Sequence, residues 1–250
     1  MRALFEGLID LLFPPECCHC GRWLLPRHHR DAVLCESCRF ALPWIPTELC
    51  IRCQDRPPRG RHATCARCTG PSLVLSTTAA VRYEGDIPDW IRRMKYPEPG
   101  TRGLDPAPLA VARLLAREAA RRCPAEPPDA VVAVPLHRRR FAERGFNPAA
   151  IAAHDVARAI GRPFEARILL RTRETPSQTD LDRPGRRRNV AAAFQPHRRC
   201  PARIWLVDDV VTTGATLSAC ALALQLAGAR EVDALCLART PPPEAQSSRR

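Results

Sequence analysis

Two adjacent carboxylates, Asp208 and Asp209, follow a run of apolar residues (204–207) near the end of the sequence. Such a run is typical of a buried strand, and ligands of parallel α/β sheets bind at the carboxyl ends of the strands. Neighbouring carboxylates at that position can accept hydrogen bonds from vicinal sugar hydroxyls or assist a hydrated Mg²⁺. We therefore predict that Asp208 and Asp209 are the catalytic acids of an active site.

The turn after these acids has the composition of a phosphate-binding loop. It holds three threonines and a glycine and leads into an apolar helical pattern, where helix N–H groups and the helix dipole favour an anion. A ribose with a 5′-phosphate would satisfy the acids and the turn together, whereas the alternative is an ordinary capped helix after a strand. ATP-binding and dinucleotide-binding glycine motifs are absent from the sequence. The predicted phosphate-binding residues are Thr212, Thr213, Gly214, Ala215 and Thr216.

Nine of the 13 cysteines lie within residues 17–68, and eight of these form four Cys-x-x-Cys pairs. Each half of the segment supplies four thiolates, which suits a tetrahedral structural Zn²⁺ that has no position left for water. Redox-active dithiols, disulfides, iron–sulfur ligation and cross-braced pairing of the two halves are the alternatives. Cys18 is left out of the set because its spacing to Cys20 is less suitable, and His19 and His62 because eight cysteines already fill both sites. The predicted ligands of two Zn²⁺ ions are Cys17, Cys20, Cys35, Cys38, Cys50, Cys53, Cys65 and Cys68.

The overall composition is that of a folded protein with a basic balance. Hydrophobic residues make up 45% and charged residues 26% of the 250 residues, which argues against global disorder. An aromatic content of 5% disfavours nucleic-acid binders that work through aromatic platforms. Lys95 is the only lysine, so the net charge of +13 comes almost entirely from arginine. Because so complete a bias is typical of genomic composition, the charge alone indicates little about partners.

Strand-like and helix-like segments alternate after residue 72, whereas the chain before it is rich in Cys, Pro and Arg. We predict strands at 72–83, 130–136, 203–211 and 231–239, and helices at 108–123, 147–161 and 215–229. Helices between strands indicate right-handed crossovers and a parallel sheet. The predicted organisation is an N-terminal helix with a double zinc ribbon (1–71), an α/β domain (72–240) and a disordered tail (241–250).

Membrane insertion and secretion are not expected from the sequence. It has no run of 18 apolar residues, the length that a membrane-spanning helix needs. Glu6 and Asp10 interrupt the apolar residues at the N-terminus, and no small-residue cleavage site follows them. We therefore expect a cytoplasmic protein, in which paired thiols hold metal rather than form disulfides.

The acidic strand end and its turn resemble the 5-phosphoribosyl-1-diphosphate (PRPP) signature of type I phosphoribosyltransferases, which have a Rossmann-like parallel sheet. Together with the double zinc ribbon, the wider pattern resembles the ComF family over about residues 10–240. The segments that carry this resemblance are 93–96, 134–140, 143–147 and 175–178, with Arg186, Asn189, Val190 and Phe194. Two places depart from the family pattern: Pro148 stands where Gln is usual, and residues 97–103 replace a shorter turn.

The resemblance implies a Mg²⁺-dependent displacement of pyrophosphate from C1 of PRPP by a nucleophile, usually a nitrogen of a base, with inversion. Asp208 and Asp209 would hold the ribose hydroxyls, and residues 212–216 would cradle the 5′-phosphate. A turn after the strand that ends at Val134 would meet the pyrophosphate, although a solvated loop is the alternative for His137. The predicted pyrophosphate-binding residues are Pro135, Leu136, His137 and Arg138.

The polar segment 171–189 is long for a simple connection, which predicts a mobile lid over PRPP. Closure of such a lid would exclude water from the reacting carbon. The alternative for the charged residues of this segment is a solvated charge run. The predicted lid residues are Ser177, Gln178, Arg186 and Asn189.

The leading functional hypothesis is a phosphoribosyltransferase with an unidentified, nucleobase-like small-molecule acceptor. A PRPP or nucleotide sensor that lacks catalysis is one alternative. Another is an adaptor that handles single-stranded DNA, because ComF relatives are associated with DNA uptake in natural transformation. In that case the partners would be single-stranded DNA or proteins of the competence machinery.

Overall fold

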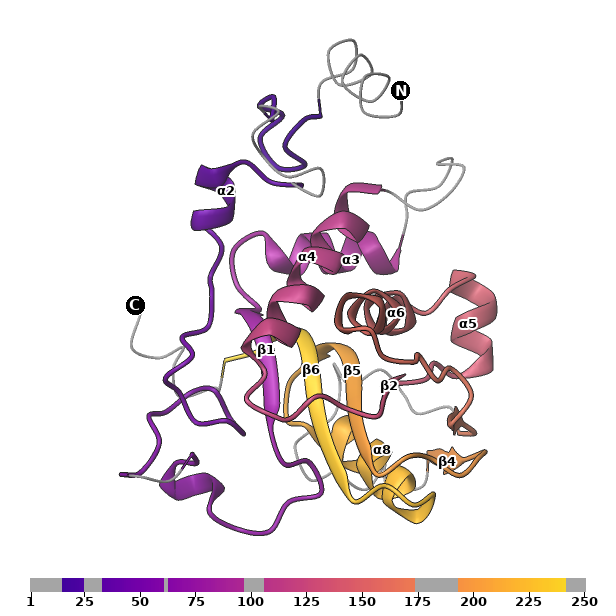
Figure 1. Cartoon of the computed structure of the whole chain (residues 1–250). Coiled ribbons are helices and arrows are strands. Elements are labelled where there is room, and N and C mark those ends of the chain that lie inside the picture. Colours follow the sequence, from indigo (N-terminus) through magenta and orange to yellow (C-terminus); the bar gives the residue numbers. More distant parts are fainter. Residues whose placement is uncertain (1–14, 25–32, 61–62, 97–105, 174–192, 242–250) are drawn as a thin grey trace.

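The fold is built on a four-stranded parallel sheet (Figure 1). The computed structural model describes residues 15–24, 33–60, 63–96, 106–173 and 193–241. The sheet has the strand order β1-β6-β5-β2, and all three pairings are parallel. Its strands are β1 (Thr77–Arg82), β2 (Ala130–Ala133), β5 (Arg203–Val211) and β6 (Glu231–Arg239). The carboxyl ends of all four strands therefore lie at one edge of the sheet.

Two of the four predicted strands are shorter than expected. The strand predicted at 72–83 begins at Thr77, whose N–H donates to the carbonyl of Ile51 (2.7 Å) in the N-terminal segment. The strand predicted at 130–136 ends at Ala133, two residues before Pro135, which has no N–H to continue the ladder. In both cases the apolar pattern continues beyond the hydrogen-bonded strand.

Helices cover both faces of the sheet. Helices α4 (Pro106–Arg122) and α6 (Pro148–Ile160) pack on one face, and α8 (Ala215–Leu226) packs on the other (Figure 1). Alternate residues of β5 serve the two layers, because successive side chains of a strand point to opposite faces. Trp205 belongs to the core with α4 and α6, whereas Leu206 belongs to the core with α8. All three helices begin and end within three residues of their predicted bounds.

Shorter elements that were not predicted complete the fold. Two are helices, α3 (Ile87–Lys95) and α5 (Arg138–Arg144), and both follow the carboxyl end of a strand of the main sheet. Strands β3 (Leu169–Arg171) and β4 (Phe194–Pro196) form a separate antiparallel pair. The N-terminal segment contributes α2 (Glu36–Phe40) and a 3₁₀ turn, η1 (Ala66–Cys68).

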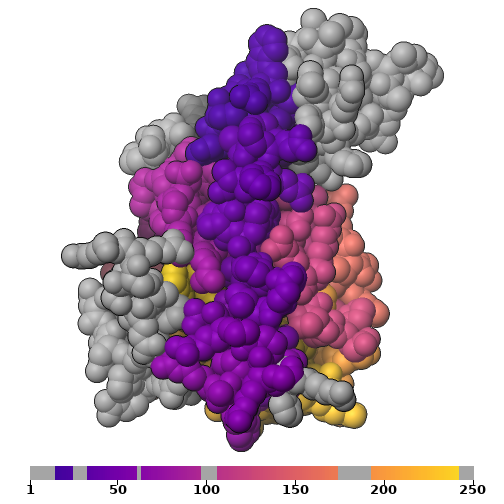
Figure 2. All heavy atoms as spheres, turned by 90° about the vertical axis from the view of Figure 1, so that its left-hand side faces the viewer, coloured from indigo at the N-terminus to yellow at the C-terminus, as the bar shows by residue number. Residues whose placement is uncertain are grey.

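The cysteine-rich N-terminal segment runs along one side of the molecule (Figure 2). It covers β1, the edge strand of the sheet, through main-chain hydrogen bonds from Ile45 N to Ala80 O (3.1 Å) and from Arg82 N to Pro43 O (2.8 Å). The buried Gln54 side chain adds two further hydrogen bonds, one from Ala79 N and one to Ala79 O. The segment thus protects an edge that would otherwise present unpaired backbone groups. The domain boundary near residue 72 stays a prediction.

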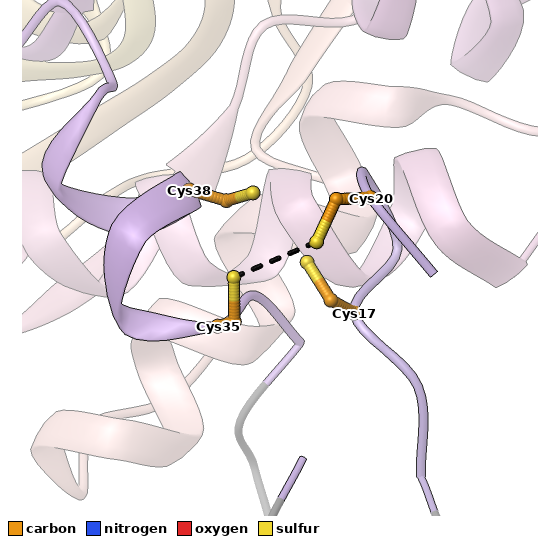
Figure 3. Close-up of side chains that lie close together, drawn as sticks. All are labelled: Cys17, Cys20, Cys35 and Cys38. Atoms are coloured by element: carbon orange, nitrogen blue, oxygen red, sulfur yellow. Dashed lines mark hydrogen bonds between the residues drawn. The ribbon is translucent and has the colours of Figure 1, made fainter. Parts of the chain in front are cut away.

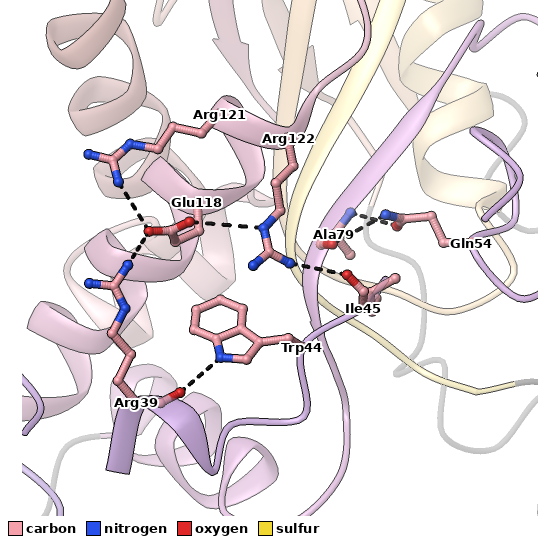
Figure 4. Close-up of polar contacts among 8 residues, drawn as sticks. All are labelled: Arg39, Trp44, Ile45, Gln54, Ala79, Glu118, Arg121 and Arg122. Carbon is pink, nitrogen blue, oxygen red and sulfur yellow. Dashed lines mark hydrogen bonds and ion pairs between the residues drawn. The ribbon is translucent and has the colours of Figure 1, made fainter. Parts of the chain in front are cut away.

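A buried glutamate fastens the same segment to α4 (Figure 4). Glu118, which is 7% exposed, accepts a hydrogen bond from Arg39 Nη2 at 2.6 Å. Arg122, one turn further along α4, donates to the carbonyl of Ile45 (3.1 Å), and its guanidinium lies 4.7 Å from the ring centroid of Trp44. A buried carboxylate is stable only when it is paired, so this contact ties the two parts of the chain together.

Candidate functional site

The two predicted catalytic acids lie near the carboxyl end of strand β5, at the edge of the sheet where ligands of such folds bind. Asp208 is half-buried, and its Oδ1 accepts a hydrogen bond from the N–H of Asp209 (2.9 Å). Burial and the neighbouring carboxylate of Asp209 raise the pKa of Asp208 to about 7, although the cations Lys95 and Arg171 act in the opposite direction. The pair therefore combines Asp208, whose raised pKa favours protonation of its carboxylate, with Asp209, whose carboxylate forms an ion pair with a cation.

That cation is Lys95. Its Nζ lies 2.7 Å from Asp209 Oδ2, and the two side chains are only 23% and 16% exposed. Lys95 is the last residue of α3, so this helix reaches the carboxyl end of β5 from above β1 (Figure 1). In the sequence, Lys95 was notable as the only lysine and as part of the family-like segment 93–96, and no contact with the acids was expected for it.

The predicted phosphate-binding residues form the junction between β5 and α8. Gly214 is the N-cap of α8 with φ = 77°, a left-handed conformation that favours glycine. The hydroxyl of Thr213 accepts a weak hydrogen bond from Ala215 N (3.4 Å). Residues 210–213 thus connect the two acids of β5 to the N-terminus of α8. Its binding of phosphate stays a prediction.

The predicted pyrophosphate-binding segment begins beside the acids, because β2 is the neighbour of β5 in the sheet. His137 is the N-cap of α5, and its Nδ1 accepts a hydrogen bond from Arg139 N (3.4 Å). Arg138 is exposed at the first position of that helix. Asn147 ties the segment to α6, since its Nδ2 donates to the carbonyl of Val134 (2.9 Å) and its Oδ1 caps the helix. His137 therefore caps helix α5, and its contact with pyrophosphate stays a prediction.

The predicted lid residues Ser177, Gln178, Arg186 and Asn189 lie outside the described residues. The described chain on either side of residues 174–192 is the antiparallel pair β3–β4, in which Arg171 is opposite Phe194. The guanidinium of Arg171 lies 5.5 Å from the ring centroid of Phe194 and lowers the pKa of Asp208 through its charge. The base of the predicted lid is thus close to the acidic pair.

The eight predicted zinc ligands form two separate clusters, in each of which the sulfur atoms lie within 4.8 Å of one another. Cys20 Sγ and Cys35 Sγ are 3.7 Å apart in the first cluster (Figure 3), as are Cys53 Sγ and Cys65 Sγ in the second. A tetrahedral Zn²⁺ with bonds of about 2.3 Å requires sulfurs about 3.8 Å apart, so both clusters fit the ion. The first cluster is Cys17, Cys20, Cys35 and Cys38, and the second is Cys50, Cys53, Cys65 and Cys68.

The clusters bear on two of the alternatives for the cysteines, cross-bracing and disulfides. Each zinc site takes its ligands from one half of the segment, so the two halves are not cross-braced. None of the cysteines, all of which are described, is in a disulfide. The Ser37 hydroxyl, 3.2 Å from Cys35 Sγ, lowers the pKa of Cys35 to about 6, whereas burial and the neighbouring thiols raise the pKa of Cys38 in the same cluster. His62 lies outside the described residues.

The first cluster packs directly against α3. The His19 ring meets Trp90 edge to face, with 5.5 Å between centroids, and His19 Nε2 is 3.5 Å from Asp86 Oδ2. Cys17 and Cys35 belong to the same buried core as Trp90. Helix α3 therefore packs against the first zinc cluster through Trp90 and contacts the acid Asp209 through its last residue, Lys95.

In the parts of the chain that the structure describes, no helix has both the length and the apolar character that crossing a bilayer requires.

Residues 8–69 match the family model of the double zinc ribbon domain. The chain is thus a double zinc ribbon protein with a parallel α/β sheet, and this confirms the expected fold class. It is 32% identical over 215 residues to the DNA utilization protein YhgH of Escherichia coli O157:H7, covering 84% of this chain and 86% of that protein. With the Salmonella typhimurium protein of the same name it shares 33% identity over 230 residues, or 90% of each chain. It is also 34% identical over 140 residues to competence protein F of Haemophilus influenzae, covering 52% of this chain and 59% of that protein. The chain belongs to the ComF family, as its motifs indicated.

Similar solved structures include a purine phosphoribosyltransferase from Pyrococcus horikoshii Ot3, with a TM-score of 0.33 and 22% identity, covering 52% of this chain and 72% of that one. Another is the glutamine PRPP amidotransferase of B. subtilis, with a TM-score of 0.38 and 22% identity, covering 58% of this chain and 30% of that one.

Proposed function

We propose that this protein binds PRPP with Mg²⁺ at the carboxyl edge of the sheet and transfers its phosphoribosyl group to a nucleobase-like acceptor. The observation that carries the proposal is the junction of β5 and α8, where Asp208 and Asp209 near the carboxyl end of the strand are followed, after residues 210–213, by a glycine-capped helix N-terminus. Carboxylates suit the two ribose hydroxyls, and the helix N-terminus suits the 5′-phosphate. A single ribose 5-phosphate spans both groups.

The charges at this edge suit the other end of PRPP. Lys95 forms an ion pair with Asp209, and the charge of Arg171 lowers the pKa of Asp208. Cations beside the acids offset their repulsion for a ligand with several negative charges. Mg²⁺, held through water by Asp209, would neutralise the leaving pyrophosphate. The exposed Arg138, at the end of the neighbouring strand β2, would add a charge-assisted hydrogen bond.

The proposed transfer forms a C–N bond at C1 of the ribose while the bond from C1 to the pyrophosphate oxygen breaks. The electron pair of the broken bond leaves with pyrophosphate, and the attacking nitrogen loses a proton. Asp209 and Asp208 would hold the ribose in place while positive charge develops on it, and positioning of this kind lowers the barrier. Asp208, whose pKa is about 7, is suited to accept the proton near neutral pH.

Release of pyrophosphate from PRPP tests the proposal. Wild-type protein is incubated with PRPP, Mg²⁺ and purine or pyrimidine bases one at a time, and pyrophosphate is measured with a coupled assay. We expect release with at least one base, and its loss in Asp209→Asn. PRPP binding without release by any acceptor would instead favour a sensor.

The names of the relatives favour a link to DNA. Two are DNA utilization proteins and one is a competence protein, and we propose that PRPP binding by this chain serves the same process. Helix α5 offers a surface for single-stranded DNA in an adaptor role, because Arg138 and Arg139 are exposed beside Phe141, which is 51% exposed. The affinity for labelled single-stranded DNA is measured at increasing salt concentrations. An affinity that does not fall as the salt concentration rises would count against such contacts.

A further inference from the structure

Helix α3 has a second face that the zinc ribbon and the core leave open. One side of the helix is buried, with Trp90 against His19 and Met94 in the same core. The other side carries Pro88, Arg92 and Lys95, whose i, i+4, i+7 spacing places them on one helix face. We call these three residues the stripe; Ile91, at its edge, is buried in the core.

This stripe forms one wall of a pocket of about 400 Å³, a volume in the range of small-molecule sites. Two tyrosines flank it, Tyr83 just after β1 and Tyr96 just after α3. Arg144 of α5 lies over one face of the Tyr96 ring at 4.9 Å from its centroid. The Tyr96 side chain is 61% exposed, so its ring remains accessible to a ligand. We call this space the α3 pocket.

The α3 pocket and the acidic pair share a side chain. Lys95 lines the pocket, and its Nζ is 2.7 Å from Asp209 Oδ2. A ligand in the pocket would therefore lie next to the group that holds Asp209. In the proposed reaction Asp209 holds the ribose hydroxyls, so the pocket is placed to present a nucleophile to the sugar.

The chemistry of the walls selects a class of ligand. Tyrosine rings stack on flat aromatic rings and gain little from a saturated or very small nucleophile. Asp89 accepts hydrogen bonds and Arg92 donates them, and the two are held together by an ion pair of 2.6 Å. A ring with N–H groups and with carbonyl or ring-nitrogen acceptors on its edge would use both side chains. Tyr83, Tyr96, Asp89 and Arg92 thus match the face and the edge of such a ring.

We propose that the α3 pocket binds a planar, nitrogen-containing heteroaromatic ring as the acceptor. The inference rests on the proposed phosphoribosyl transfer for its function, but the binding of the ring does not depend on it. It assigns the acceptor side of the reaction to α3 and to the two tyrosines that flank the α3 pocket, whereas the β5–α8 junction is proposed for the phosphate.

Ligand-detected NMR on the full chain tests the assignment. The probes are adenine, hypoxanthine, uracil and nicotinate, with cyclohexanecarboxylate as a saturated control, each with and without PRPP and Mg²⁺. We expect at least one heteroaromatic ring to bind and the saturated ring not to bind. Tyr96→Ala should raise the Kd of that ring about tenfold, since stacking on one aromatic side chain is worth that much. Asp89→Asn should raise the Kd as well. Glu231 is an exposed acid at the amino end of β6, so Glu231→Gln should leave the Kd unchanged.

The outcomes separate the pocket from the proposed function. PRPP binding without binding of any heteroaromatic ring would overturn the pocket and leave the function standing, as would a Kd that neither pocket variant changes. Ring binding that is weakened by Tyr96→Ala in a protein that does not bind PRPP would support the pocket and overturn the function. Failure of both kinds of ligand to bind would overturn both. Because Tyr96 and Asp89 are exposed, thermal melting curves of the variants are expected to match the wild type.

Discussion

Lys95 Nζ lies 2.7 Å from Asp209 Oδ2, and this ion pair joins the end of α3 to the carboxyl end of β5. The same helix packs against the first zinc cluster through Trp90 and His19. One short helix thus connects the zinc ribbon, the α3 pocket and the acidic pair.

Removal of the Lys95 charge should weaken PRPP binding. Lys95→Met deletes the cation that offsets the charge of Asp209, so we expect the Kd for PRPP with Mg²⁺ to rise about tenfold or more. The pKa of Asp208 should also rise further, because the charge of Lys95 lowers it in the wild type. Titrations at several pH values measure both effects. Lys95→Arg, which keeps the charge, is the control, and an unchanged Kd in Lys95→Met would contradict the role.

Asp208 should make the protein less stable as the pH rises. Its pKa in the folded protein is about 7, above the value of about 3.9 for an unperturbed aspartate. Between these values the folded state binds more protons than the unfolded state, so the free energy of unfolding falls as the pH rises through this window. Asp208→Asn cannot ionise and keeps the oxygen that accepts the Asp209 N–H.

We therefore expect Asp208→Asn to melt at a higher temperature than the wild type at about pH 8, with the difference vanishing near about pH 4. Melting curves across this range measure the effect, and Glu126→Gln, at an exposed acid, is the control that should show no such trend. A wild type that is stabilised by the same rise in pH, relative to Asp208→Asn, would contradict the burial of this carboxylate.

Glu118 should hold the N-terminal segment to α4. In Glu118→Gln the hydrogen bonds from Arg39 and Arg121 lose their charged acceptor, so the free energy of unfolding should fall by about 2 kcal/mol. Urea unfolding measures the change, again with Glu126→Gln as the control. A double-mutant cycle with Arg39→Ala isolates the pair, and additive effects would show that the two side chains do not interact in solution.

Metal analysis should find two zinc ions per chain, one for each cluster. Cys38→Ser and Cys68→Ser should each reduce the content to one, because they remove a ligand from different sites. A chelator should lower the melting temperature of the wild type. A folded protein that contains no metal and has oxidised cysteines would contradict the assignment.

The features that were predicted correctly are local in the sequence. The β5–α8 junction could be recognised because four apolar residues, two acids and then a glycine occur within residues 204–214. The zinc ligands could be recognised because the two cysteines of each pair are three positions apart. Helices α4, α6 and α8 were recognised from apolar periodicity over more than ten residues. Local rules of this kind do not depend on which distant parts of the chain meet.

The features that were missed depend on tertiary contacts or on short segments. Lys95 and Asp209 are far apart in the sequence, and nothing near either residue indicates their ion pair. Helix α5 is polar with no buried residue, and β3 and β4 are three residues each, so none has a periodic pattern to recognise. The main-chain bonds that place the zinc ribbon along β1, such as that from Ile45 to Ala80, involve backbone groups that every residue carries.

Calorimetric titration of PRPP with Mg²⁺ into the full chain tests the central proposal most directly. Binding to a single site is expected for the wild type, with the Kd raised at least tenfold in Asp209→Ala, which loses the carboxylate proposed for the ribose. Gly214→Val should also weaken binding, because a β-branched residue resists the left-handed conformation at the start of α8. Absence of binding by folded, zinc-loaded wild type, or equal affinity in Asp209→Ala, would contradict a PRPP site at the end of β5.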